Sequence, residues 1–104
     1  MAGMNIVARR LKQARLRQGI SQRALGIRAG MDPSTASSRI NQYERGKHVP
    51  DLGTAARLGK VLEVPAPYLY AQDEALAAWI LVFARVTPEL RKSVVRKASK
   101  PSGP

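Results

Sequence analysis

Residues 39–53 read RINQYERGKHVPDLG, and the pattern of this segment is the most informative in the chain about its structure. Ile40 and Tyr43 stand three residues apart, a spacing that places both side chains on one face of a helix, so we expect both in the core. Gly46 marks the end of that helix, because glycine commonly terminates helices. Pro50-Asp51 then opens another helix. The stretch therefore predicts two helices joined by a short loop.

The rest of the chain predicts helices throughout, because apolar residues recur at helical spacing and nowhere alternate as in a strand. We expect Asn5, Ser21 and Asp32 to cap helices, with Pro33 at a first helical position. The expected helices span, in chain order, residues 5–18, 22–29, 33–45, 52–62, 73–86 and 88–98, with a turn and a short helix over 64–70. The fold class is therefore all-α.

The helical spacing also predicts which side chains are buried in the later helices. The inward positions of the 52–62 helix are Leu52, Ala55, Leu58 and Leu62. Gly59 inside that helix is a weak point of about 1 kcal/mol relative to alanine. The inward positions of the 88–98 helix are Leu90, Val94 and Val95. Arg9 and Arg10 either add charge to a binding surface or form a solvated face.

Net charge points to a polyanionic partner. The chain carries 18 Lys and Arg against 7 Asp and Glu, a formal charge of +11 in 104 residues. With no cysteine and His48 as its one histidine, it offers no metal site, and we expect no cofactor and no small-molecule ligand. No secretory signal or membrane span is apparent, so a cytoplasmic, nucleoid-associated protein is expected. The seven Asp and Glu residues are scattered along the chain and form no catalytic cluster, so we expect that the protein is not an enzyme.

Two sequence elements carry a resemblance to a known family. Ser21-Gln22 is followed by Gly30, and Ile40-x-x-Tyr43-Glu44-x-Gly46 comes after it. This pattern resembles the Cro/C1-type (XRE family) helix-turn-helix regulators, over residues 6 to about 70. The resemblance implies a compact lambda-repressor-like domain of about five helices over residues 1–70. It also implies sequence-specific binding of double-stranded DNA, with one helix in the major groove.

The chain departs from the family pattern between Gly30 and Gly46, where it has about four extra residues. Four residues are close to one α-helical turn of 3.6 residues, so the helical phase nearly survives. The insertion forms either an extra turn of helix over residues 33–36 or a longer loop. DNA contacts known for the family can therefore be assigned more securely to residues near the end of the 33–45 helix than to residues near its start.

The resemblance places the base-reading positions on Ser37, Ser38 and Gln42, with Arg39 and Asn41 beside them. Asn and Gln can bind adenine through two hydrogen bonds, and Arg can bind guanine in the same way. The simpler alternative for the two serines is exposed helix surface. The expected phosphate contacts are Lys47, His48 and Gln22, although Gln22 could instead serve as a helix cap.

A different role is expected for Arg15 and Glu44. In members of the family an arginine of the first helix often pairs with the glutamate before the glycine. A two-bond contact between guanidinium and carboxylate would tie the first helix to the end of the base-reading helix. The resemblance therefore implies a structural pair, with neither residue touching DNA.

The segment 71–98 is expected to be a helical dimerisation extension, followed by a disordered tail over 99–104. Its 73–86 helix is apolar on all sides, so more than one side needs cover. The expected interface residues are Leu76, Trp79, Ile80 and Phe83; the alternative is that the helix only pads the monomer core. We therefore expect a homodimeric repressor on a palindromic operator. An antitoxin that autoregulates its operon is the main alternative, and a nonspecific architectural protein is another.

Overall fold

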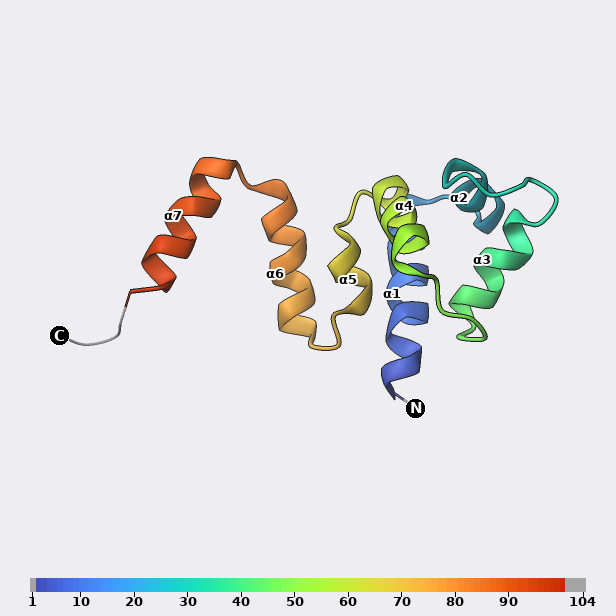
Figure 1. Cartoon of the computed structure of the whole chain (residues 1–104), viewed down its shortest axis with the longest axis horizontal. Coiled ribbons are helices and arrows are strands. Elements are labelled where there is room, and N and C mark those ends of the chain that lie inside the picture. Colours follow the sequence, from blue (N-terminus) through green and yellow to red (C-terminus); the bar gives the residue numbers. More distant parts are fainter. Residues whose placement is uncertain (1, 101–104) are drawn as a thin grey trace.

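The computed structural model describes residues 2–100, which form seven α-helices and no strand (Figure 1). This confirms the all-α prediction. The helices are α1 (Ala2–Gln18), α2 (Gln22–Arg28), α3 (Ala36–Glu44), α4 (Leu52–Leu62), α5 (Ala66–Tyr70), α6 (Glu74–Arg85) and α7 (Pro88–Ala98). None of them is long and apolar enough to cross a membrane. Residues 101–104 of the predicted tail lie outside the described residues.

One hydrophobic core joins α1 to α5. Leu11, Leu25, Ile40, Leu58 and Leu69, one from each of these helices, are completely buried in it. The prediction that Ile40 and Tyr43 belong to the core is confirmed, with 0% and 9% of their surfaces exposed. Burial of such apolar side chains stabilises the fold by about 1.5–3 kcal/mol each. The five helices therefore form a compact body with α3 on its surface.

Local capping explains where several helices begin. The side chains of Ser21, Asp51 and Thr87 each accept a hydrogen bond from a backbone N–H three residues ahead, at 3.0, 2.7 and 3.2 Å. Asp73 accepts from the N–H groups of Ala75 and Leu76. The hydrogen bond from the Thr54 N–H lowers the pKa of Asp51. Such caps satisfy N–H groups that a helix start leaves without partners.

Two predicted helix starts are wrong. α1 begins at Ala2, so Asn5 lies inside it and does not cap it. α3 begins at Ala36, so the four extra residues form a longer loop and not a helical turn. In this loop the Asp32 carboxylate accepts hydrogen bonds from the Ser34 N–H and hydroxyl, at 2.8 and 2.6 Å. Aspartate next to proline favours such a local turn as readily as a helix.

Several burial predictions are also wrong. Leu52 is 78% exposed at the first position of α4, where it lies outside the core. Leu90, Val94 and Val95 are exposed on α7, because nothing within residues 2–100 covers that helix face. Arg10, by contrast, is only 2% exposed and is not part of a solvated face.

Gly59 is more than a weak point of α4. A Cβ atom at this position would lie 2.7 Å from the backbone oxygen of Val64. The chain turns back here from α4 towards α5, and this close approach of the backbone needs a residue without a side chain.

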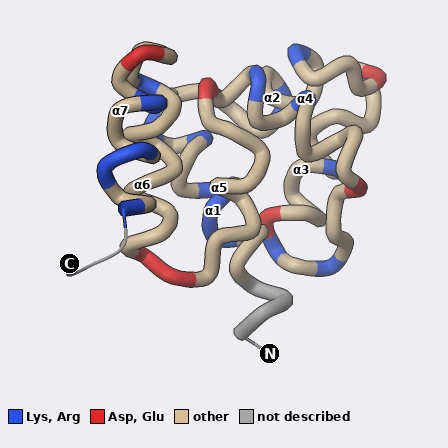
Figure 2. Tube along the Cα trace, turned by 60° about the vertical axis from the view of Figure 1, so that its left-hand side comes forward, with Lys and Arg blue, Asp and Glu red and all other residues tan. Residues whose placement is uncertain are grey.

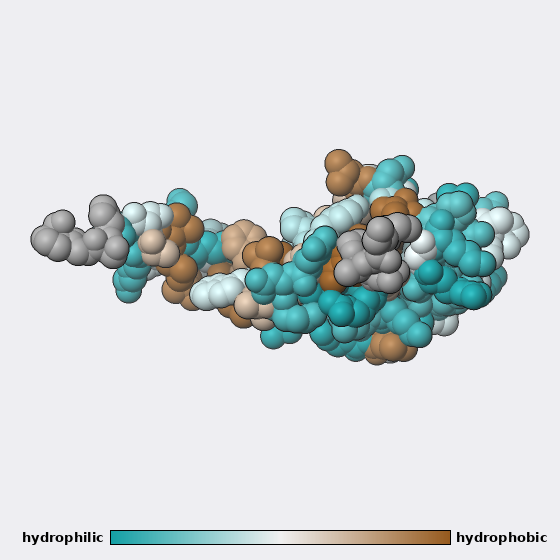
Figure 3. Space-filling model, turned by 90° about the horizontal axis from the view of Figure 1, so that it is seen from below, coloured by the Kyte–Doolittle hydropathy of each residue, from teal (hydrophilic) through white to brown (hydrophobic). Residues whose placement is uncertain are grey.

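The C-terminal helices give the protomer an elongated shape. Its extents are 60 × 31 × 22 Å and its radius of gyration is 16.0 Å, against about 13 Å for a compact chain of this length. α6 packs beside α5, whereas α7 extends away from the body (Figure 1). We call α6 and α7 together the arm. Apolar surface is visible on the arm in Figure 3.

Candidate nucleic-acid interface

The helix pair α2 and α3 presents one polar face to solvent. The two helices approach each other closely where Gly26 meets Ala36, and a Cβ atom on Gly26 would lie 2.7 Å from the Cβ of Ala36. Leu25 and Ile40 are buried behind this contact. The contact sets the distance between the two helices. This contact is not among the features predicted from the sequence, although a glycine inside a short helix can indicate such a close approach.

The outer face of α3 carries most of the predicted base-reading residues. Ser37, Ser38, Arg39 and Gln42 are exposed there, and Asn41 is half-buried. Ser38 donates its hydroxyl to the Thr35 carbonyl at 3.1 Å, which leaves the oxygen able to accept. The face is therefore a row of hydrogen-bonding groups on a rigid helix.

Arg39, Gln42 and His48 meet around a shallow groove with a volume of about 320 Å³, which Tyr43 and Val49 also line. The groove lies between α3 and the loop that follows it. Gly46 turns the chain there with a positive φ of 73°, and the N–H of Lys47 donates to the Gln42 carbonyl at 2.9 Å. The loop is thus held against the end of α3.

Gln22 lies beside this face but has partners inside the protein. Its Nε2 donates to Oδ1 of Asn41 at 3.3 Å and to Oε1 of Glu44 at 3.2 Å. A carboxylate only accepts, so Glu44 fixes which end of the Gln22 amide faces it. The remaining Oε1 of Gln22 is an acceptor, which phosphate oxygens do not bind. Gln22 therefore braces α3 in this arrangement.

Arg15 and Glu44 form the predicted structural pair. Nε of Arg15 lies 2.6 Å from Oε2 of Glu44, and Nη2 lies 3.0 Å from Oε1. The exposed fractions of the side chains are only 12% and 3%. The hydrogen bond to Glu44 raises the pKa of Arg15, and Nη1 also donates to the Ile20 carbonyl at 3.0 Å. The pair holds the end of α3 against α1.

Positive charge lies on both the α2–α3 part and the arm (Figure 2). Lys47 and His48 are exposed on the loop after α3. Arg23, exposed in the first turn of α2, is a further basic residue, which is not among the predicted site residues. Its place directly after Gln22 could have indicated it.

The predicted interface residues of α6 do not all share one face. Leu76, Trp79 and Phe83 are 52%, 64% and 53% exposed, and Val82 beside them is 49% exposed. Ile80 instead packs against the core, together with Leu81. Arg91 of α7 lies 4.0 Å from the centre of the Phe83 ring and donates to the Phe83 carbonyl at 3.0 Å. We call Leu76, Trp79, Val82 and Phe83 the outer face of α6.

Comparisons with known proteins agree with this arrangement. The model of a helix-turn-helix domain family matches residues 6–69. The chain is also similar to the crystal structure of the transcriptional regulator BswR, with a TM-score of 0.78 and 46% sequence identity, over 88% of this chain and 90% of that chain. No curated protein matches.

The chain belongs to the helix-turn-helix domain family. The Cro/C1-type resemblance is consistent with this membership. In helix-turn-helix proteins the second helix of the motif lies in the major groove and the first crosses the backbone; α2 and α3 are the first and second helices of the motif in this chain.

Proposed function

We propose that this protein is a sequence-specific, double-stranded DNA-binding transcriptional regulator that acts as a homodimeric repressor on a palindromic operator. The outer face of α3 carries the proposal, because it combines exposed hydrogen-bonding side chains with firm support from behind. α2 and the Arg15–Glu44 pair provide that support. The similarity to a transcriptional regulator adds to it.

In this proposal α3 reads bases. Gln42 and Arg39 are exposed one helical turn apart, so they can reach neighbouring base pairs. Gln suits adenine and Arg suits guanine in the major groove. Ser37 and Ser38 can donate to or accept from either base of a pair. Asn41, whose Oδ1 accepts from Gln22, keeps its amide N–H groups for a base or a phosphate.

Lys47, His48 and Arg23 supply the phosphate contacts. All three are exposed near the edges of the α3 face, where the DNA backbone runs when a helix occupies the major groove. Lys47 and Arg23 are the lysine and arginine among them, and side chains of these two types release counterions from the phosphates that they neutralise. Gln22 serves the interface mainly by bracing α3.

The outer face of α6 is the proposed dimer interface. Four neighbouring apolar side chains are about half exposed there, including the large Trp79 and Phe83. Aromatic residues dominate many interfaces because they bury large areas. A two-fold dimer would present two α3 helices to inverted half-sites about one DNA turn apart. A dimer bound in this way would repress transcription by occupying the operator.

We expect affinity for an operator duplex to fall steeply with salt. Each neutralised phosphate contributes a slope of about −0.9 to the plot of log affinity against log salt. A dimer in which each protomer neutralises two phosphates gives a slope of about −3.6. Fluorescence anisotropy across a salt series measures this slope. Lys47→Ala should make it shallower by about 1.8, and a flat salt response would contradict the proposed interface.

Gln42→Ala is expected to weaken binding to the preferred site by about 1–3 kcal/mol per half-site, because two hydrogen bonds to one base are lost. It should also relax base preference at one position of each half-site. Competition binding against operators with every base at each position measures both effects. Lys47→Ala is the matched control, and it should weaken all sequences about equally. An unchanged preference in Gln42→Ala would show that Gln42 does not read bases.

A further inference from the structure

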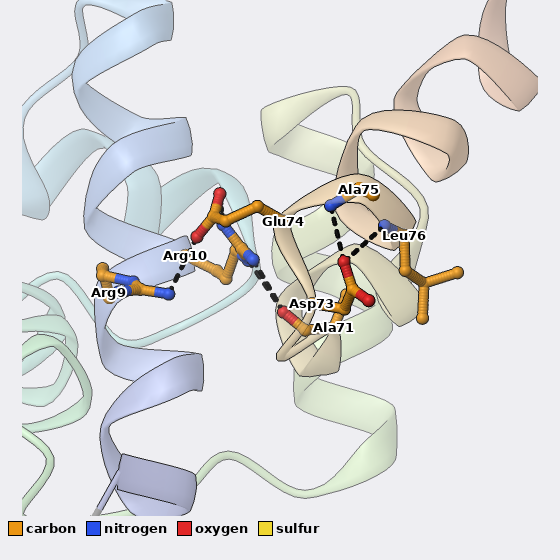
Figure 4. A network of polar contacts seen from close by, with 7 residues as sticks. All are labelled: Arg9, Arg10, Ala71, Asp73, Glu74, Ala75 and Leu76. Carbon is orange, nitrogen blue, oxygen red and sulfur yellow. Dashed lines mark hydrogen bonds and ion pairs between the residues drawn. The ribbon is translucent and has the colours of Figure 1, made fainter.

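Arg10 of α1 is buried at the corner where α5 ends and α6 begins. Only 2% of its surface is exposed. Its Nε and Nη2 donate to the carbonyl oxygen of Ala71 at 3.0 and 2.8 Å, and its Nη1 lies 3.1 Å from Oε2 of Glu74 (Figure 4). The guanidinium thus binds the corner at two places, one before and one within the first turn of α6.

Neighbouring groups complete this contact. Nη2 of Arg9 lies 3.0 Å from the other Glu74 oxygen, Oε1. The Tyr68 ring lies under Arg10, with its centre 5.5 Å from the guanidinium carbon. Asp73 caps α6 directly beside them. Three elements, α1, α5 and α6, therefore meet at one arginine.

Apolar packing alone holds α6 only lightly. Ala77 is the one fully buried residue of this helix, and Ile80 and Leu81 are partly buried. A groove of about 620 Å³ runs between α1 and α6, lined by Arg10, Leu16, Tyr68, Ala77 and Leu81 among others. With so little packing and an open groove beside it, the angle of α6 depends strongly on the polar contacts at its first turn.

α1, which holds α6 through Arg10, also holds the proposed base-reading helix α3. Arg15 of α1 is bonded to Glu44 at the end of α3. Arg10 and Arg15 are separated by about 7.5 Å along one helix at 1.5 Å per residue. A continuous set of rigid contacts thus runs from α6 through α1 to α3.

We propose that Arg10 is a positioning residue that sets the angle of α6 against the DNA-binding body and so determines the spacing of operator half-sites. The inference rests on the proposed dimer through α6. A rotation of about 10° over half of the 60 Å long axis moves the far end by roughly 5 Å, more than the 3.4 Å of one base-pair step. If the angle of α6 is no longer fixed, the protein should accept operators with different half-site spacings. Base recognition by α3 should stay unchanged.

The test compares operators that carry identical half-sites separated by spacers of different length. The wild type should prefer one spacer at least 10-fold over spacers longer or shorter by two base pairs. In Arg10→Met this preference should fall below 3-fold, while the base preference within each half-site and the dimeric state stay as in the wild type. A purely structural role would not move spacer preference separately from base preference.

Arg9→Met is the matched control, because Arg9 is 53% exposed and contacts Glu74 but not Ala71; it should keep the sharp spacer optimum. Two further variants keep the test decisive if Arg10→Met folds poorly. Arg10→Lys keeps the positive charge but loses the paired hydrogen bonds to the Ala71 carbonyl. Glu74→Ala removes the carboxylate that Arg10 contacts, and its side chain is 71% exposed, so the fold should tolerate the change. Both should broaden the preference.

Folded Arg10 and Glu74 variants with the wild-type spacer profile would overturn the role of Arg10 and leave the proposed function standing. A wild type that is monomeric, or that shows no spacer optimum, would overturn the dimeric proposal itself and this inference with it.

Discussion

The Phe83→Asp variant is expected to be monomeric at concentrations where the wild type is a dimer, and to bind the operator about 100-fold or more weakly. Phe83 lies on the outer face of α6 and is 53% exposed in the protomer. A carboxylate there would lose its water on burial in the proposed interface, and this desolvation costs more than an ion pair with the neighbouring Arg91 returns. Affinity falls because two linked modules gain about 10²–10⁴ in avidity over single binding. Trp79→Asp, at a 64% exposed position, should behave in the same way.

Sedimentation equilibrium of wild type and both variants measures the oligomeric state. Circular dichroism is recorded first, because a loss of helix would imply unfolding. Arg91 lies beside Phe83, so the new aspartate has a cationic neighbour and the protomer should keep its fold. Leu52→Asp is the control, an equally drastic change at a 78% exposed leucine outside the arm; it should remain dimeric.

A wild type that stays monomeric at tens of micromolar, roughly the range in which weak dimers form, with and without operator DNA, would contradict the dimer. The outer face of α6 would then be available to another protein, as expected for an antitoxin.

Removing either partner of the Arg15–Glu44 pair is expected to destabilise the fold by about 3–5 kcal/mol, because the other charge is left buried and unpaired. Glu44 is 3% exposed and Arg15 12%, so water cannot replace the missing partner fully. The double variant Arg15→Met/Glu44→Leu should lose less than the sum of the single variants, since no charge is then stranded. Operator affinity should fall as well, because the pair holds α3.

A double-mutant cycle in urea measures the coupling between the two residues. The matched control is the Arg9–Glu74 pair, whose Nη2–Oε1 distance of 3.0 Å equals the longer of the two Arg15–Glu44 bonds, but whose exposed fractions are 53% and 71%. Exposed pairs contribute about 0–1 kcal/mol, so the cycle with Arg9→Met and Glu74→Gln should give little coupling. If the Arg15–Glu44 cycle gave no more coupling than this control, the pair would not be a structural tie.

The helix limits that could be predicted from the sequence are those fixed by local chemistry. Ser21 caps its helix as expected because the cap involves only residues three positions apart. The Arg15–Glu44 pair could also be predicted, but from family resemblance and not from spacing. α3 ends close to the predicted residue in spite of the insertion, because the extra residues lie before Ala36.

Features that depend on contacts distant in sequence could not be predicted. Arg10 reads as a surface residue on a basic helix, and only the fold brings Ala71, 61 positions later, to its guanidinium. For Gln22 the sequence predicts either a phosphate contact or a helix cap, and its hydrogen bond to Glu44 follows only from the fold. The apolar stripe of α7 was expected to face inward, because the spacing shows which side is apolar but not what covers it.

Selection of bound duplexes from a random DNA pool, followed by sequencing, measures directly whether α3 recognises specific bases. We expect enrichment of two inverted half-sites whose centres lie about one helical turn, 10–10.5 base pairs, apart. Repeating the selection with Gln42→Ala should relax one position in each half-site and leave the spacing unchanged. A pool that shows no sequence enrichment after repeated rounds, despite measurable DNA binding, would contradict sequence-specific recognition by α3.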